Sequence, residues 1–135
     1  MTKITVMLLD EMKAAEEKIV SLTAYDSSFA TVLDEAGIEI ILVGDSLGMV
    51  LHGQDSTLNV TMEDMIYHIR QVVAGSRHAM IIADMPYKSY LNPEQALINA
   101  RRMVKEGGAD EVSIGKRLVG EDIEGNLRNF EEKIN

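Results

Sequence analysis

The sequence predicts a parallel α/β fold built from repeated strand–helix units. Short apolar runs suited to buried strands alternate with segments whose apolar residues recur at the i, i+3, i+4 spacing of a helix. Strands and helices alternate four times after a leading helix, and right-handed βαβ crossovers are the usual connection in such a series. The pattern fits an open doubly wound sheet or the first half of an eightfold barrel, and does not separate them.

The leading helix and the first unit occupy the N-terminal third of the chain. Residues 5–17 place apolar side chains on helical spacing between acids and lysines, and residues 18–25 form a β-prone run. Asp26 is suited to cap the next helix, which Gly37 would end. The apolar face of that helix would consist of Phe29, Val32, Leu33 and Ala36.

The second unit starts with the nearly continuous apolar strand at residues 38–43, typical of a sheet covered on both faces. A glycine-containing loop follows, and then a helix that Thr61 would cap and Gly75 would close. Its predicted apolar positions are Met62, Met65, Ile66, Ile69, Val72 and Val73.

The third and fourth units repeat the scheme. Residues 78–83 form an apolar strand, and Asn92 followed by Pro93 opens a helix that continues to the glycine pair at 107–108. A weaker strand at 109–114 precedes a last amphipathic helix. That helix would present Ile123, Leu127, Phe130 and Ile134 on one side.

Composition limits the class of protein. With 46% apolar and 26% charged residues, the chain is expected to fold as one soluble domain, residues 1–135. No apolar run approaches the ~20 residues of a membrane span and no secretory leader is evident, so a cytoplasmic location is expected. The absence of cysteine excludes disulfides and thiolate sites. A net charge of -9 argues against nucleic acid as a partner.

Two aspartates follow apolar strands at equivalent places. Asp45 follows strand 38–43 and Asp84 follows strand 78–83, and ligands of parallel α/β folds gather at this end of the strands. Two converging carboxylates repel each other unless a proton or a cation lies between them. Mg²⁺ is the natural cation, because one or two carboxylates commonly hold it while water and substrate oxygens complete its shell. The simpler alternative is that each aspartate only makes a turn.

Other residues near these strand ends are weaker candidates for ligand binding. Gly44 and Gly48 would let a ligand approach the backbone, and Ser46 would offer a hydroxyl to an anionic oxygen. Tyr25 and Asp26 share the same rim, although Asp26 is equally suited to capping. His52 in the glycine loop could contact a substrate, but a solvated side chain is expected there. His68 and His78 have no metal-ligand spacing between them and are expected to be structural.

Several stretches together resemble the ketopantoate hydroxymethyltransferase family. The resemblance covers residues 21–112 in the family's order. It is carried by TAYD (23–26), LVGDSLGM (42–49), HGQDSTL (52–58), ADMP (83–86) and PEQA (93–96).

The resemblance implies a (β/α)8 barrel of the phosphoenolpyruvate mutase and isocitrate lyase type, of which the chain would hold an N-terminal helix and about four β/α units. It implies transfer of a hydroxymethyl group from 5,10-methylenetetrahydrofolate to 3-methyl-2-oxobutanoate, giving 2-dehydropantoate for pantothenate synthesis. Asp45 and Asp84 would bind Mg²⁺, and Asp45, Ser46 and Asp84 would contact the oxoacid. The partners would be this oxoacid and folate, and a homo-oligomer is expected.

The chain departs from the family pattern in one motif and in length. Where the family has Val-Lys-Ile-Glu, with the lysine on the oxoacid and the glutamate near the metal, residues 112–115 read Val-Ser-Ile-Gly. Lys116 would have to reach the site from a loop. The family's general base is expected in a C-terminal half beyond Asn135, so no catalytic residue is assigned. Two alternatives follow: a noncatalytic half-barrel with a partial metal or oxoacid site, and another Mg²⁺-dependent oxoacid enzyme of the same superfamily.

Overall fold

The computed structural model describes residues 2–114 and 117–119. In this part of the chain, strands form one sheet in which each strand pairs with the next along the sequence. The first four strands run parallel, and the last pairs antiparallel with the fourth. The strands are β1 (Ser21–Thr23), β2 (Ile40–Val43), β3 (Met80–Asp84), β4 (Glu111–Ile114) and β5 (Arg117–Val119).

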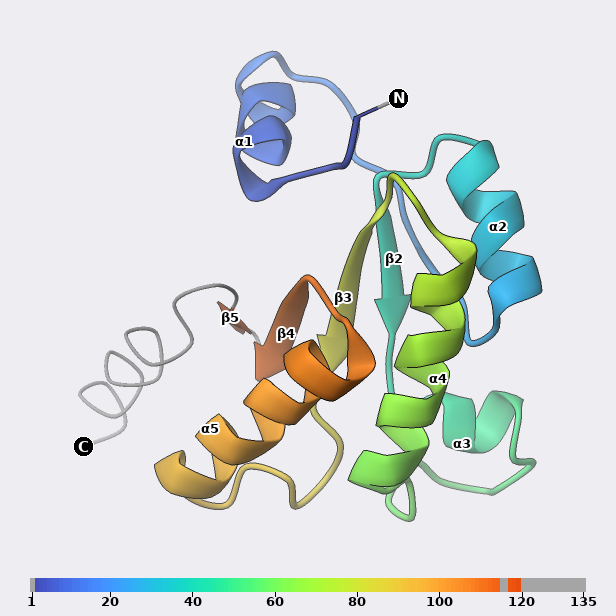
Figure 1. The fold of residues 1–135 in the computed structure, drawn as a ribbon, viewed down its shortest axis with the longest axis vertical. Helices are drawn as coiled ribbons and strands as arrows, with labels where there is room; N and C mark the ends of the chain where they lie inside the picture. Colours follow the sequence, from blue (N-terminus) through green and yellow to red (C-terminus); the bar gives the residue numbers. More distant parts are fainter. Residues whose placement is uncertain (1, 115–116, 120–135) are drawn as a thin grey trace.

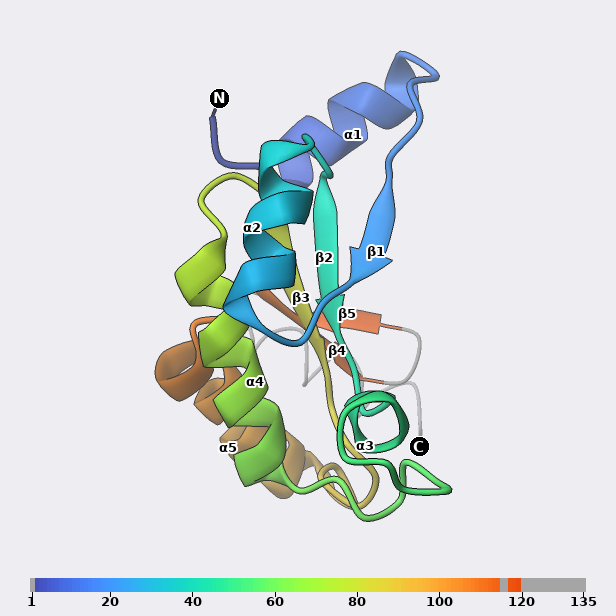
Figure 2. The same ribbon diagram turned by 90° about the vertical axis from the view of Figure 1, so that its right-hand side faces the viewer.

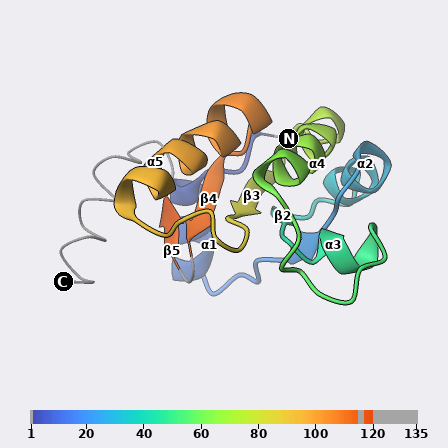
Figure 3. The same cartoon turned by 90° about the horizontal axis from the view of Figure 1, so that it is seen from below.

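Helices cover one face of this sheet (Figures 1 and 3). They are α2 (Ser27–Glu35), α4 (Met62–Gly75) and α5 (Pro93–Arg102), which continues into the π-helical turn η1 (Met103–Gly107). Figure 2 shows α1 (Val6–Ala14) across the end where the parallel strands begin and α3 (Leu47–Val50) at the end where they finish. None of the helices in the described ranges has the length and apolar character needed to cross a bilayer.

The strand order separates the two architectures that the sequence left open. A doubly wound sheet reverses its strand order at a switch point and carries helices on both faces. Here β1 to β4 follow chain order without reversal, and α2, α4 and α5 lie on the same face (Figure 3). The sheet is therefore part of a βα barrel, with its other face toward the barrel interior.

The core lies between this sheet and its helices. Alternate strand residues point toward the helices and are buried there; they include Ile41, Val43, Ile81, Ala83, Val112 and Ile114. The intervening residues face the barrel interior, where Met80 and Ile82 are buried and Asp84 and Ser113 are partly exposed. Asp84 and Ser113 are paired across β3 and β4, so two polar groups meet on the inner face.

Local signals placed the starts of α2, α4 and α5 correctly, whereas α1 ends at Ala14, before the predicted residue 17. Asp26, Thr61 and Asn92 each accept a hydrogen bond from a backbone N–H three residues on, and Thr61 forms a full capping box with Asp64. Gly37 ends α2 with a φ of 83°, a left-handed conformation that favours glycine.

The expected apolar face of α2 is wrong except at Leu33, which is partly buried against the core. Phe29 and Val32 are 66% and 62% exposed, while Ala30 and Asp34 are the buried residues of this helix. The start of α2 lies very close to the end of α4, where a β-carbon on Gly75 would be 2.3 Å from the backbone oxygen of Ser27. The sequence also did not predict α3 or the antiparallel strand β5. The predicted helix containing Ile123, Leu127, Phe130 and Ile134 lies outside the described residues.

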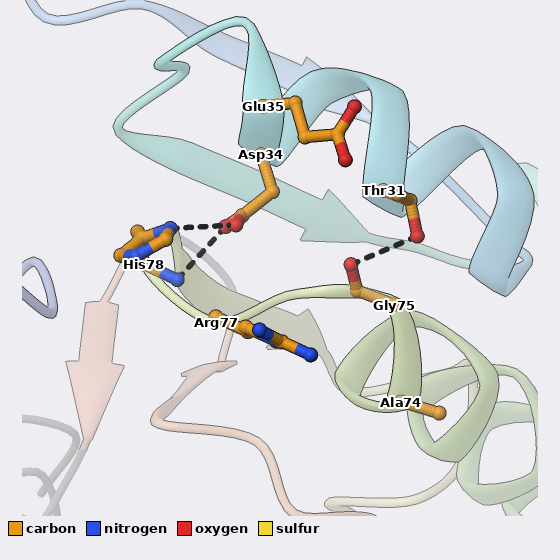
Figure 4. Close-up of a pocket in the computed structure, with 7 residues that line it drawn as sticks. All are labelled: Thr31, Asp34, Glu35, Ala74, Gly75, Arg77 and His78. Carbon is orange, nitrogen blue, oxygen red and sulfur yellow. Dashed lines mark hydrogen bonds and ion pairs between the residues drawn. The ribbon is translucent and has the colours of Figure 1, made fainter. Parts of the chain in front are cut away.

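A buried carboxylate joins α2 to the start of β3 (Figure 4). Asp34 accepts four hydrogen bonds, all 2.8–2.9 Å long, from the Ser76 hydroxyl, the His78 N–H, the His78 Nδ1 and the Ala79 N–H. Beside it is a cavity of about 310 Å³ that Glu35 and Arg77 also line. This cavity lies at the end of the sheet where the strands start. In βα barrels, residues at that end contribute to stability, whereas active sites lie at the opposite end. His78 is structural, as the sequence predicts.

Replacing Gly75 by alanine is expected to destabilise the fold. A β-carbon at Gly75 would lie 2.3 Å from the backbone oxygen of Ser27, so α2 and α4 would have to separate. We expect Gly75→Ala to lower the free energy of unfolding by about 2 kcal/mol, measured by urea denaturation. Ala74→Ser, at the neighbouring exposed position, should change it by less than about 0.5 kcal/mol. Equal stability of the two variants would contradict this close approach.

Candidate active site

Two carboxylates lie at the rim where β2 and β3 end. These strands pair in parallel with Val43 opposite Ala83, so Gly44 and Asp84 come next on each strand. The Asp84 Oδ2 atom is 3.1 Å from the point that a β-carbon on Gly44 would occupy. The charge of Asp45, one residue further along, acts on the Asp84 carboxyl. The structure thus brings Asp45 and Asp84 to the same end of the sheet.

The electrostatic environment of Asp84 is unfavourable for a bare carboxylate. Burial raises the pKa of the Asp84 carboxyl, a hydrogen bond from the Ser113 side chain lowers it, and the negative charge of Asp45 raises it further. The net effect is a pKa above the ordinary value. In the metal-free protein, ionising this carboxyl therefore costs free energy that a bound cation would offset.

Ser46 is held in place from the neighbouring strand. Its Oγ atom forms a hydrogen bond with the Tyr25 hydroxyl, and Tyr25 itself is 8% exposed. The backbone around Ser46 is a tight turn into α3, in which the N–H groups of Leu47 and Gly48 donate to the carbonyls of Gly44 and Asp45. β1 and β2 therefore orient the serine hydroxyl together.

The fourth strand contributes Ser113, which sequence reasoning gave no role. Its side chain hydrogen-bonds the Asp84 carboxyl, and its backbone oxygen accepts from the Met85 N–H at 2.9 Å. The register that pairs Asp84 with Ser113 explains the contact, and the sequence alone does not fix that register. Gly115 and Lys116, the other positions of this motif, lie outside the described residues.

The donor set at this rim suits a hard divalent cation. Asp45 and Asp84 supply carboxylate oxygens, and Ser46 supplies a neutral one. Within the described ranges, no three His, Asp or Glu side chains are grouped so that they could hold a metal ion. The ligands from the described part of the protein would therefore be these two carboxylates, without a third charged side chain. Mg²⁺ is commonly held in this way, with water and substrate oxygens as its other ligands.

The remaining candidates have structural partners. Asp26 caps α2, accepting from the Phe29 N–H at 2.8 Å. The His68 ring contacts the Tyr25 carbonyl. His52 is exposed, as the sequence predicts, but its ring contacts His68, an interaction that the sequence did not indicate.

A family model provides the decisive comparison. The model for ketopantoate hydroxymethyltransferase matches residues 3–125. The chain belongs to the ketopantoate hydroxymethyltransferase family. A relative from Nitrosococcus oceani named 3-methyl-2-oxobutanoate hydroxymethyltransferase is 54% identical over 125 residues, covering 92% of this chain and 47% of the relative. A relative of the same name from Dehalococcoides mccartyi is 59% identical over 111 residues, covering 82% and 39%. The chain spans about half the length of the curated relatives it matches.

Solved structures agree with the barrel assignment. Two crystal forms of 2,3-dimethylmalate lyase, a PEP mutase/isocitrate lyase superfamily member, are similar to this chain with TM-scores of 0.62 and 0.58. The first covers 99% of this chain and 50% of the lyase at 20% identity, and the second covers 79% and 36% at 22% identity. At these identities the likeness concerns the fold. Family membership and the partial-barrel fold are thus confirmed.

Replacing Asp84 by asparagine is expected to stabilise the metal-free protein at neutral pH. Because the pKa of Asp84 is raised in the folded state, the cost of its ionisation develops as the pH rises above the unfolded value of about 3.9. We expect Asp84→Asn to raise the melting temperature at pH 7 in EDTA, relative to the wild type. The gain should shrink below about pH 4, where the folded and unfolded states are both protonated. A melting temperature lowered by this substitution would contradict the assigned environment.

Proposed function

We propose that this chain carries the metal-binding and oxoacid-binding part of a ketopantoate hydroxymethyltransferase. The reaction would transfer a hydroxymethyl group from 5,10-methylenetetrahydrofolate to 3-methyl-2-oxobutanoate, giving 2-dehydropantoate. The observation that carries the proposal is the convergence of Asp45 and Asp84 at the strand ends, within the family's matched region. Burial in the first place, and then the negative charge of Asp45, raises the pKa of the Asp84 carboxyl.

The residues of this rim have separable tasks in the proposed site. Asp45 and Asp84 would fix the position of Mg²⁺, which when bound supplies Lewis-acid polarisation of a ketone oxygen. Ser46, oriented by Tyr25, would hydrogen-bond an oxygen of the oxoacid. Gly44 leaves room at this place, since a β-carbon there would crowd Asp84. These groups position the oxoacid, and no described residue is assigned as the base that removes its proton.

A second candidate function is a site that binds but does not turn over its ligand. Ser113 stands where the family pattern has a lysine, and a serine hydroxyl cannot supply positive charge to a carboxylate ligand. In this structure its side chain is directed to Asp84. Catalytic groups that act as a unit lose most of their effect when one is removed.

Hydrogen exchange distinguishes the two functions. The purified chain would be incubated with Mg²⁺ and 3-methyl-2-oxobutanoate in D₂O, and the proton on the carbon beside the ketone followed by NMR. Exchange that needs Mg²⁺ and is lost in Asp45→Asn but retained in Asp10→Asn supports the transferase function. Mg²⁺-dependent binding of the oxoacid without exchange supports the noncatalytic site. Absence of both would contradict the proposed site.

We also propose a cytoplasmic homo-oligomer. Phe29 and Val32 are 66% and 62% exposed on α2. Apolar side chains of this size on the outer surface of a helix favour a contact with another copy. Sedimentation velocity at several concentrations tests this, with Phe29→Ser expected to shift the chain toward the monomer. A chain that is monomeric throughout would contradict it.

A further inference from the structure

Two histidine rings meet beside the candidate active site. His52 follows α3 and His68 lies in α4, and their Nε2 atoms are 3.3 Å apart. The ring centroids are 5.4 Å apart with an interplanar angle of 47°. The rings are thus tilted rather than stacked, and their Nε2 atoms approach each other.

The surroundings of His68 fix its orientation and its tautomer. Its Nδ1 atom is 2.8 Å from the backbone oxygen of Tyr25, and a carbonyl oxygen can only accept, so Nδ1 carries the hydrogen. In the neutral ring, Nε2 then presents a lone pair toward His52. The edge-on contact with Tyr67, at 5.2 Å between ring centroids, further restricts the ring.

We propose that His52 and His68 form a binding site for a transition-metal cation of the Zn²⁺ class, separate from the carboxylate pair. Two nitrogens bound tetrahedrally to zinc at about 2.0–2.1 Å are about 3.4 Å apart, close to the 3.3 Å found here. A metal-bound histidine usually donates its other N–H to an oxygen acceptor, the arrangement that His68 has with Tyr25. Without a metal, the same two nitrogens are joined by an N–H···N hydrogen bond of 3.3 Å, which zinc binding would replace.

The site offers two protein ligands and open coordination positions. His52 is exposed and His68 is partly buried, so water can reach the point between their nitrogens. In the described part of the chain no third His, Asp or Glu completes the group, and water would supply the remaining ligands. Imidazole nitrogens suit Zn²⁺, whereas carboxylate oxygens suit Mg²⁺, which makes the two sites chemically distinct.

A metal at this place would connect the loop after α3 to α4. His52 is anchored through its backbone N–H to the Leu47 carbonyl at 3.1 Å. His68 is joined to Tyr25, whose hydroxyl meets Ser46. Zinc bound here would therefore restrict the segment that leads out of the candidate active site.

Zinc titration of the untagged chain tests the proposal. Calorimetry would be run after EDTA treatment and dialysis, with about 10 mM Mg²⁺ present so that the carboxylate pair is occupied. We expect one Zn²⁺ per chain, and at least a tenfold loss of affinity in His52→Gln and in His68→Gln. His52 is exposed, so His52→Gln should retain the melting temperature of the metal-free wild type.

The third histidine provides an internal control. The chain has three histidines and no cysteine, and His78 is paired with Asp34. In ¹H–¹⁵N spectra of the imidazole rings, Zn²⁺ should shift the signals of His52 and His68 and leave that of His78 in place. Zinc affinity unchanged in His52→Gln, displacement of Zn²⁺ by Mg²⁺, or no zinc binding at all would overturn the proposal.

Discussion

Asparagine at position 45 or 84 is expected to weaken divalent-cation binding by at least about a hundredfold, because each substitution removes one of two anionic ligands of a doubly charged ion. Mn²⁺ would serve as the probe, with free Mn²⁺ measured by EPR and Mg²⁺ as competitor. Asp84→Asn is the sharper variant, since it should stabilise the metal-free fold while removing the cation site. Loss of binding would then not reflect unfolding.

Asp10→Asn is the matched control for this prediction. Asp10 lies exposed in α1, at the opposite end of the sheet from α3 (Figure 2), and its substitution changes the net charge by the same amount. Its Mn²⁺ affinity should stay within about twofold of the wild type, because exposed charges beyond a Debye length are largely screened. Retention of wild-type affinity in Asp84→Asn would contradict a shared cation.

Asp34→Ala is expected to cause the largest loss of stability. The substitution removes the carboxylate that accepts hydrogen bonds from Ser76, His78 and Ala79. These donors lie next to the core and would be left without an acceptor. Removing one member of such a buried charged network costs about 3–5 kcal/mol. The measurement is the free energy of unfolding in urea. Glu35→Gln, at the adjacent exposed position, should change it by less than about 0.5 kcal/mol.

The contribution of Asp34 should depend on pH. Burial acts to raise the pKa of this carboxyl, but the backbone N–H groups of Ala79 and His78 and the side chains of Ser76 and His78 hold it far below its usual range. The stabilisation is therefore complete above the unfolded value of about 3.9 and is lost as the pH falls toward the folded value. The stability difference between wild type and Asp34→Ala should shrink between pH 5 and pH 2. A constant difference would contradict the depressed pKa.

Most elements of the fold could be predicted from local signals. The caps at Asp26, Thr61 and Asn92 and the apolar runs of β2 and β3 each have a sequence signature that the structure retains. The orientation of α2 could not be predicted, because it depends on the contact between Gly75 and Ser27 from another helix. β5 could not be predicted either, because it is only three residues long and forms by pairing with β4. So short a segment carries no strand pattern of its own.

The candidate site was predictable where topology alone determines position. Asp45 and Asp84 follow neighbouring parallel strands, so their meeting at one rim follows from strand order. The hydrogen bond between Tyr25 and Ser46 and the one from Ser113 to Asp84 depend on side-chain conformation and register, which periodicity does not specify. The contact of His52 with His68 was missed for the same reason, since a loop and a helix supply one ring each.

The most direct test of the central claim is a crystal structure of this chain with Mg²⁺ and 3-methyl-2-oxobutanoate. We expect one octahedral cation with a carboxylate oxygen of Asp45 and of Asp84 about 2.0–2.1 Å away, and oxygens of the oxoacid among its other ligands. A cation bound elsewhere, or the oxoacid bound with Asp45 and Asp84 directed away from it, would contradict the claim.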